Sequence, residues 1–283
     1  SFGQEPPPMR FETVEAYPSA RGMGASASAI VAGLVLARAA GGLPLPDRDL
    51  AGLGVAIEGH ADNVLPALFG GLVLATGVQG GSRPPERMDP VGGDQAADSL
   101  ARRSSAAGRT GSWVSKSAAS AARAPSSPAG APDGEGVPWM RFEPPAAIAP
   151  VVLVARRGLR TSEARRVLPD VVPRADAVAN ASATGALVAI LSGAAPPGGL
   201  LHATEDRLHE PYRLPLMPET RELHRHLRAC GIATALSGAG PSLVCLAEAA
   251  GLDRTLAVVA GALPEGWQVL TPGWDLEGAC IVG

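Results

Sequence analysis

The chain has 283 residues, including 35 Gly and 27 Pro, with 4% aromatic and 18% charged residues. Its formal net charge of −3 argues against a dedicated nucleic-acid binder, which would carry a basic face. Three widely spaced cysteines exclude a disulfide framework and a CxxC metal site, so a reducing cytoplasm is favoured. No segment has the pattern of a membrane span or a targeting peptide, and the length allows one large or two small domains.

The first region, residues 11–78, is patterned like ordered structure. In chain order it predicts a strand over 11–16, helices over about 26–39, 47–58 and 63–69, and a strand over 71–76. We expect Asp47 to cap the second of these helices, and Asp62 or Asn63 could cap the third.

The second region, residues 80–136, is built of Ser, Ala, Gly, Pro and Arg without apolar periodicity. It can bury too little apolar surface to offset its ordering entropy, so we interpret it as a disordered insertion. Its arginines could form a docking tail for an anion, although we favour an accidental charge pattern. A sequence-level artefact of gene prediction is the third alternative.

The third region, residues 137–283, is patterned again. It predicts strands over 149–154, 232–236, 243–247 and 268–270, helices over 161–167, 175–191, 219–229 and 252–262, and a turn over 237–241. Short strands that alternate with helices on both sides of an insertion indicate an α+β or α/β fold.

Several side chains of this region have an expected environment. Thr161 is expected to cap its helix, and Leu223 and Leu227 lie at helical spacing on one apolar face. Met217 and Cys245, like Met23 near the N-terminus, are interpreted as packing residues. The histidines of polar helical stretches are expected to lie in solvent rather than to bind a ligand: His202, His224 and His226.

The glycine-rich segment over residues 18–29 has the physics of a phosphate site. It is neither a Walker A loop nor a dinucleotide fingerprint. Gly22 and Gly24 let the backbone approach an anion, and the following helix directs its free N–H groups at that anion. Ser26 and Ser28 offer hydroxyls suited to capping or to Mg²⁺. By itself, the segment leaves phosphate binding and a plain capped turn both open.

A second segment gathers Glu58, His60, Asp62 and Asn63 within six positions. Carboxylates with an amide suit a hard cation and an alcohol substrate, whereas a helix cap alone would not need all four. A third segment, Ser-Gly-Ala-Gly-Pro-Ser over residues 237–242, lies between two apolar strands and is a weak signal alone.

The order of these three segments resembles the GHMP kinase superfamily, and within it the actinobacterial homoserine kinase family. Two further segments support this. Residues 160–169 resemble the family's Thr-x-x-Ala-Arg-x-x-Leu-Pro segment, and residues 203–213 resemble its Asp-x-x-His-x-Pro-x-Arg segment. The implied fold is α+β, with a partly missing ribosomal-S5-like N-terminal domain over 1–79 that carries the ATP loop. The insertion over 80–136 and a ferredoxin-like C-terminal domain over 137–283 follow.

The resemblance implies an ATP-dependent small-molecule kinase that phosphorylates L-homoserine to O-phospho-L-homoserine in threonine biosynthesis. It also implies Mg²⁺ as a cofactor and a cytoplasmic protein without nucleic-acid or membrane partners, and it is compatible with a homodimer. Two alternatives stay open. One is a GHMP kinase for another small alcohol, and the other is a non-catalytic, truncated relic.

The resemblance also assigns roles by motif. The cofactor-binding residues would be Pro18, Arg21, Gly22, Met23, Gly24, Ala25, Ser26 and Ser28. Ser26 and Glu58 would hold Mg²⁺, and Arg165 and Arg213 would hold the substrate carboxylate, a task suited to the planar guanidinium group. His60, Asp62 and Asn63 would sit at the substrate hydroxyl, with Asp62 as its proton acceptor but without a strong general base. Gly238 and Gly240 would belong to a turn that closes over the substrate.

Two departures from the family pattern concern the front of the chain. Ala25 replaces the first serine of the family's Gly-Leu-Gly-Ser-Ser loop, a loss that we expect to be tolerated. The family's opening Pro-x-Ala/Ser-Ser-Ala-Asn-Leu-Gly-Pro-Gly-Phe-Asp segment has no counterpart, and Ser1 is not preceded by Met. We therefore expect an N-terminally incomplete sequence. This exact chain is then expected to be poorly stable and inactive, because missing strands would leave exposed sheet edges.

Overall fold

The computed structural model describes residues 19–76 and 138–281. The strand predicted over 11–16, Pro18 of the glycine segment and the insertion predicted over 80–136 lie outside these described residues. The described α-helices are α1 (Ala25–Ala40), α2 (Asp47–Glu58), α3 (Val64–Phe69), α4 (Thr161–Arg166), α5 (Arg174–Leu191), α6 (Leu200–Ala203), α7 (Glu210–Arg213), α8 (Pro218–Ala229) and α9 (Leu252–Ala262). The strands are β1 (Leu72–Ala75), β2 (Trp139–Phe142), β3 (Ile148–Val154), β4 (Ala233–Leu236), β5 (Leu243–Glu248) and β6 (Gln268–Leu270).

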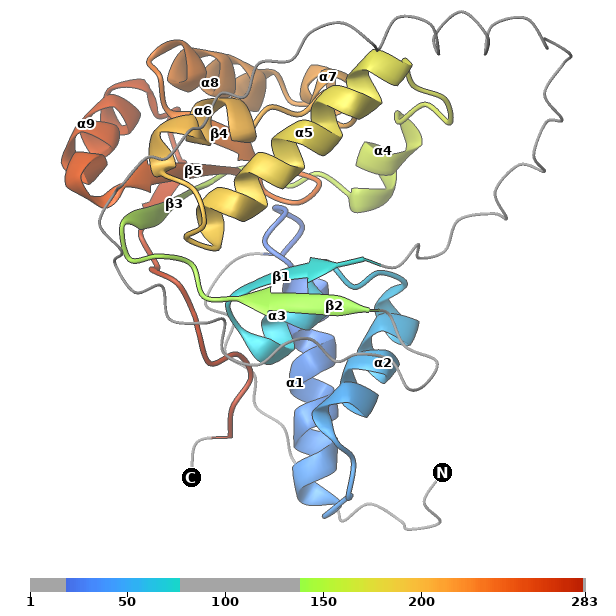
Figure 1. Ribbon diagram of the computed structural model, residues 1–283. Coiled ribbons are helices and arrows are strands. Elements are labelled where there is room, and N and C mark those ends of the chain that lie inside the picture. The colour runs from blue at the N-terminus through green and yellow to red at the C-terminus, as the bar shows by residue number, and fades with distance from the viewer. Residues whose placement is uncertain (1–18, 77–137, 282–283) are drawn as a thin grey trace, which may run out of the picture. The chain divides into compact units, whose positions relative to one another are not determined.

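Helices α1 to α3 pack together beside the antiparallel pair β1–β2 (Figure 1). Helix α1 buries Ala27, Val31 and Val35, which recur every four residues and therefore share one face. That face contacts the buried side chains of α2 and α3. Strand β2 opens the range predicted as the C-terminal domain, yet it pairs with β1. The predicted boundary at residue 137 thus separates two strands that pair.

The second sheet is antiparallel, with the strand order β4-β5-β3-β6. Side chains of β3 alternate between its faces, so Val151 and Leu153 join a core with α8 and α9. Ile148, on the opposite face, joins a core with α5 and α6. Helices therefore cover both faces of this sheet, and Figure 1 shows α5 crossing one of them.

Most predicted elements are confirmed with bounds that differ by a few residues. Two predicted caps, Asp47 and Thr161, are wrong. Asp47 and Thr161 are the first helical residues of α2 and α4, where Pro46 and Arg160 hold the N-cap positions without capping hydrogen bonds. Asn63 holds the N-cap position of α3, also without such a bond. Strand β2 and the short helices α6 and α7 had not been predicted.

Helix α8 confirms one expectation and overturns another. Leu223 and Leu227 are buried as predicted, and Met217 and Cys245 are buried packing residues. His224, however, is buried with 7% exposure rather than solvated. Thr220, Leu223, His224 and Leu227 follow the i, i+3, i+4, i+7 pattern of a buried face, so the helical spacing already carried this signal.

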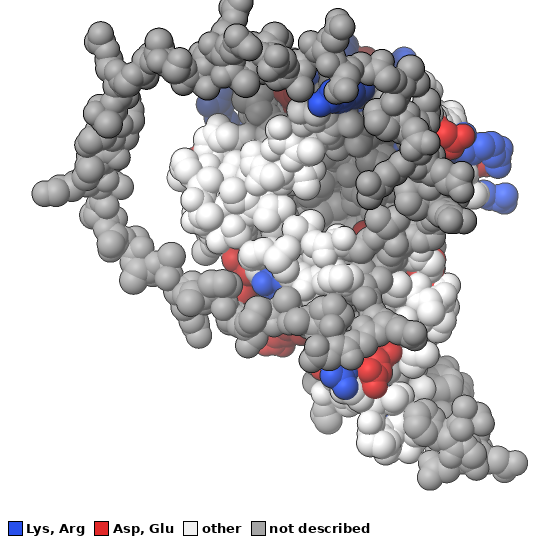
Figure 2. All heavy atoms as spheres, turned by 45° about the vertical axis from the view of Figure 1, so that its right-hand side comes forward, with Lys and Arg blue, Asp and Glu red and all other residues white. Residues whose placement is uncertain are grey.

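Two surface properties can be stated for the described residues. None of their helices combines the length and the apolar character that crossing a bilayer requires. On the face drawn in Figure 2, basic and acidic side chains lie mainly around a broad area of other residues. Both signs occur along that margin.

Candidate active site

One open pocket of about 1040 Å³ brings together residues from all five segments singled out in the sequence. The predicted site residues that line it are Gly22, Met23, Gly24, Ala25, Ser26, Glu58, His60, Asp62, Asn63, Arg165, Arg213 and Gly238. The predicted residues Arg21, Ser28 and Gly240 do not line it. Thr161, Ser162, Asp206, His209 and Glu210 also line the pocket, although none of them had been predicted as a site residue.

The glycine loop takes the conformation that its sequence favours. Gly22 and Gly24 have φ values of 75° and 72°, in the left-handed region that glycine adopts without strain. Gly24 is the N-cap of α1, and no side chain in the described structure caps this helix start. The first N–H groups of α1 are therefore available to an anion at the pocket.

The turn over residues 237–242 packs directly on this loop. The Ser237 hydroxyl donates a hydrogen bond to the Gly22 carbonyl at 2.8 Å. A Cβ at Gly22 would lie 2.0 Å from the Ser237 carbonyl oxygen, so the approach requires glycine. Gly238 lines the pocket, whereas a Cβ at Gly240 would meet Met217 at 2.8 Å. Gly240 therefore serves close packing of the turn, away from the pocket lining.

Arg21 is engaged elsewhere than predicted. Its guanidinium donates to the carbonyls of Ala155 and Arg156 at 2.7 and 2.8 Å, and to that of Ser19 at 3.2 Å. These bonds hold the glycine loop against the end of β3. Ser28 follows Ser26 by two positions on α1, about 200° around the helix axis, which explains why only Ser26 lines the pocket.

A chain of polar contacts joins the loop to the second segment. The Ser26 hydroxyl donates to Glu58 at 2.8 Å, and the other Glu58 oxygen lies 3.7 Å from His60 Nε2. His60 Nδ1 in turn contacts Asp62. The Glu58 side chain is 12% exposed and that of Asp62 is 68% exposed, so Asp62 is the carboxylate open to solvent.

The oxygens of Ser26 and Glu58 fit a magnesium ion that arrives with a nucleotide. Mg²⁺ is commonly held by one or two carboxylates together with substrate phosphates and water. In the described part of the chain, no cluster of three His, Cys, Asp or Glu side chains could hold a metal by itself. The donor set therefore suits a shared site better than a resident metal centre.

Two arginines also line the pocket. Arg165 comes from α4, and Arg213 ends α7. Arg213 donates to the carbonyls of Ala164 at 3.2 Å and Gly238 at 3.3 Å. Burial lowers the pKa of Arg213, the charge of Asp206 opposes that shift, and the charge of Arg165 adds to it. Two guanidinium groups that repel each other in this way favour the binding of an anion between them.

Asp206 and His209 form a polar pair that sequence reasoning did not assign. One Asp206 oxygen accepts the N–H groups of Leu208 and His209 at 2.7 and 3.0 Å, and the other lies 3.1 Å from His209 Nδ1. Burial alone would raise the pKa of Asp206, but these hydrogen bonds outweigh it and lower the pKa below its usual value. The Asp-x-x-His spacing in residues 203–213 was the feature of the sequence that could have predicted this pair.

Comparisons with known proteins point to one family. A family model of the GHMP kinase N-terminal domain matches residues 1–71, and a model of the GHMP kinase C-terminal domain matches residues 197–260. A homoserine kinase from Streptomyces avermitilis is 35% identical over 284 residues, covering 99% of this chain and 73% of the relative. Its counterpart from Streptomyces coelicolor is 34% identical, covering 99% of this chain and 72% of that relative.

A solved structure supports the fold. The crystal structure of a homoserine kinase from Cytophaga hutchinsonii superposes with a TM-score of 0.65 at 20% identity, over 93% of this chain and 69% of that one. A second structure, of a homoserine kinase described as putative in Listeria monocytogenes, gives a TM-score of 0.56 at 22% identity, over 93% and 69% of the two chains.

Proposed function

The chain belongs to the homoserine kinase family of the GHMP kinases, and from that membership we propose that its pocket is where ATP phosphorylates the hydroxyl of L-homoserine. The observation that carries this proposal is the composition of the pocket lining. A glycine loop at a helix N-terminus and a pair of arginines line the same pocket as Asp62. Such a pocket offers a place for phosphates, a place for a carboxylate and polar groups for a hydroxyl.

The nucleotide would be held by the backbone of Gly22 and Gly24 and by the N-terminus of α1. Ser26 and Glu58 would hold Mg²⁺, which when bound supplies neutralisation of the phosphate charge. Arg165 and Arg213 would bind the carboxylate of homoserine and thereby orient its hydroxyl. This assignment makes catalysis a matter of positioning and charge stabilisation.

In the reaction, the homoserine hydroxyl oxygen forms a bond to the γ-phosphorus while the bond between that phosphorus and the ADP oxygen breaks. The hydroxyl proton must leave, and the exposed carboxylate of Asp62 can accept it and pass it to solvent. His60 contacts Asp62, and Asn63 lies against Gly24, where a Cβ would be 3.1 Å from the amide oxygen. His60 would therefore position Asp62 at the substrate hydroxyl, and Asn63 would position the glycine loop at the phosphates.

The magnesium assignment predicts a specific change in Glu58→Gln. The neutral amide is a poorer ligand for a hard cation, so the Mg²⁺ concentration at half-maximal rate should rise severalfold. Titration of the initial rate with Mg²⁺ at fixed ATP measures this. An unchanged Mg²⁺ requirement would count against Glu58 as a ligand.

Substrate identity can be tested with an analogue of homoserine that lacks the carboxylate. The assay follows ADP release by the purified protein. ADP release should be fast with L-homoserine and much slower with 2-amino-1,4-butanediol, which has no carboxylate for the arginines. If homoserine gave no ADP while another small alcohol did, the alternative GHMP kinase activity would replace this proposal.

Other implications of the family stay predictions: a cytoplasmic homodimer that binds neither nucleic acid nor membranes.

A further inference from the structure

We infer that Glu210 is a positioning residue for homoserine binding, because its buried carboxylate fixes the helix that carries Arg213 to the strand that leads into the closing turn. Glu210 is the first residue of α7, and Arg213 is the last. Only 6% of Glu210 is exposed, which is exceptional for a carboxylate and requires compensating contacts. The inference rests on the proposed function, since it concerns how the proposed carboxylate site is held.

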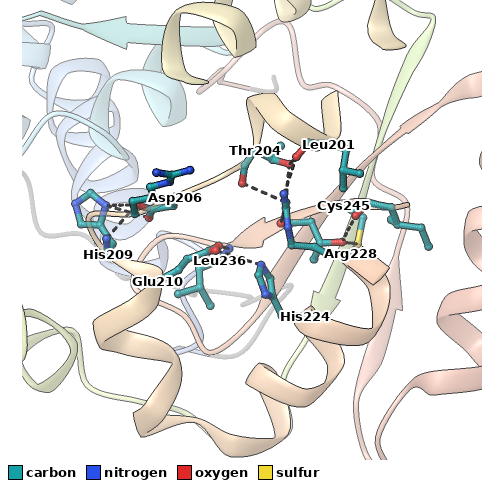
Figure 3. Close-up of polar contacts among 12 residues, drawn as sticks. Leu201, Thr204, Asp206, His209, Glu210, His224, Arg228, Leu236 and Cys245 are labelled. Atoms are coloured by element: carbon teal, nitrogen blue, oxygen red, sulfur yellow. Dashed lines mark hydrogen bonds and ion pairs between the residues drawn. The ribbon is translucent and has the colours of Figure 1, made fainter. Parts of the chain in front are cut away.

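The two carboxylate oxygens of Glu210 have different partners (Figure 3). Oε1 accepts the backbone N–H of Leu236 at 2.9 Å. Oε2 lies 3.2 Å from Nε2 of His224, whose side chain is 9% exposed. That contact has the distance of an ion pair but lacks hydrogen-bond geometry. Glu210 thus lies between the end of β4 and the buried face of α8.

Leu236 is the last residue of β4, and Ser237 begins the turn over 237–242. The contact from Glu210 therefore reaches the backbone next to the residue that holds Gly22. At the other end of α7, Arg213 donates a hydrogen bond to the Gly238 carbonyl in the same turn. Glu210 thus binds α7 to the end of β4 and Arg213 binds it to this turn, one contact on each side of Ser237.

This arrangement separates the task of Glu210 from that of Arg213. Arg213 is partly exposed to the pocket and can contact a substrate. Glu210 also borders the pocket, but its Oε1 accepts the Leu236 N–H and its Oε2 faces His224, so we expect it to act on the substrate through the placement of α7. A small displacement of a group that binds the substrate is sufficient to lower the reaction rate by a large factor.

The test compares Glu210→Ala with Glu210→Gln in the full-length protein. The alanine variant should raise the KM for homoserine about tenfold, with a smaller effect on the KM for ATP and on kcat. The glutamine variant retains an oxygen that can accept the Leu236 N–H and should recover most of the homoserine KM. A merely destabilised protein would instead lose active fraction, which lowers kcat and leaves KM unchanged. Glu222→Ala is the matched control, because Glu222 is an exposed α8 glutamate outside this pocket.

A double-mutant cycle tests whether Glu210 acts through Arg213. If it does, adding Glu210→Ala to Arg213→Ala should raise the homoserine KM little beyond the single arginine variant. The inference would be overturned if the KM of the double variant rose by the product of the two single-variant factors. An unchanged KM in Glu210→Ala would also overturn it.

Hydrogen exchange provides a readout that does not depend on turnover. The Leu236 amide should exchange faster in Glu210→Ala than in the wild type, because its acceptor is gone. If the wild type does not phosphorylate homoserine, the proposed function fails, whereas unchanged exchange at Leu236 overturns the positioning role itself.

Discussion

Two arginines near the pocket show how one residue type serves two tasks. Arg21 donates hydrogen bonds to the carbonyls of Ala155, Arg156 and Ser19, and these bonds hold the glycine loop in place. Arg213 makes longer contacts, at 3.2 and 3.3 Å, and keeps capacity for an added anion. A sequence motif can place both arginines near the site, but it does not specify which carbonyls the fold brings within reach.

Arg213→Ala should raise the KM for homoserine at least tenfold, because a hydrogen bond to a charged group contributes about 1.5–3 kcal/mol. Steady-state kinetics with homoserine as the varied substrate measure it. Arg225→Ala is the control, since Arg225 pairs with Glu222 on the exposed side of α8. An unchanged KM in the Arg213 variant would count against the carboxylate assignment.

Asp206 predicts a pH-dependent contribution to stability. Its folded-state pKa lies below the ordinary 3.8, so its contribution is complete above that value and is lost as the pH falls through the folded pKa. Asp206→Asn should therefore lower the melting temperature near neutral pH, and the difference from the wild type should shrink as the pH falls below about 4. Thermal melts between pH 6 and 3 measure the difference, and a constant difference would contradict the predicted role of the charge.

At the scale of elements, the glycine loop and the turn over 237–242 form one unit through their backbones. Gly22 is the critical residue, because its φ of 75° suits glycine and its missing side chain leaves room for Ser237. The unit explains why two glycine-rich segments far apart in the sequence belong to one site.

Gly22→Ala should lower both the melting temperature and the affinity for ATP. Any Cβ there would meet the Ser237 carbonyl, and the loop would have to move. Gly33→Ala is the matched control. Gly33 lies within α1, and a Cβ added there would meet nothing within 4 Å, so alanine should stabilise the helix by about 0.5–1 kcal/mol. Melting curves and nucleotide titrations of both variants measure this difference. Equal changes in melting temperature and in ATP affinity for the two variants would contradict the role of Gly22.

The sequence was most informative for long, periodic elements. Helix α1 and helix α9 were predicted because their apolar residues repeat over three or four turns. Strand β2 has four residues and directly follows a low-complexity segment, so its pattern was too short to recognise. Helix α7 spans one turn and contains Pro211, which also conceals it.

The motifs predicted that Ser26, Glu58, Arg165 and Arg213 belong to one site, and all four line the same pocket, while their roles stay predictions. Glu210 was missed because its function depends on Leu236 and His224, which reach it only through the fold. A buried carboxylate inside a polar segment carries no periodic signal that distinguishes it from a solvated one.

At the scale of the whole molecule, all described residues belong to one compact unit, and the pocket draws on both of its ranges. The α1–α3 region supplies the glycine loop and the residues over 58–63, while the region after residue 138 supplies the arginines and the turn over 237–242. Under the proposed assignment, binding of both substrates would depend on the contacts between the two regions, among them those of Ser237 and Arg21.

The most direct test of this account is the identity of the product. The full-length protein would be incubated with ATP, Mg²⁺ and L-homoserine, and the mixture followed by phosphorus NMR and mass spectrometry. The account predicts that one O-phospho-L-homoserine forms for each ADP, and that Arg213→Ala slows both at low homoserine. Release of inorganic phosphate without a phosphorylated amino acid, or no homoserine-dependent use of ATP, would contradict it.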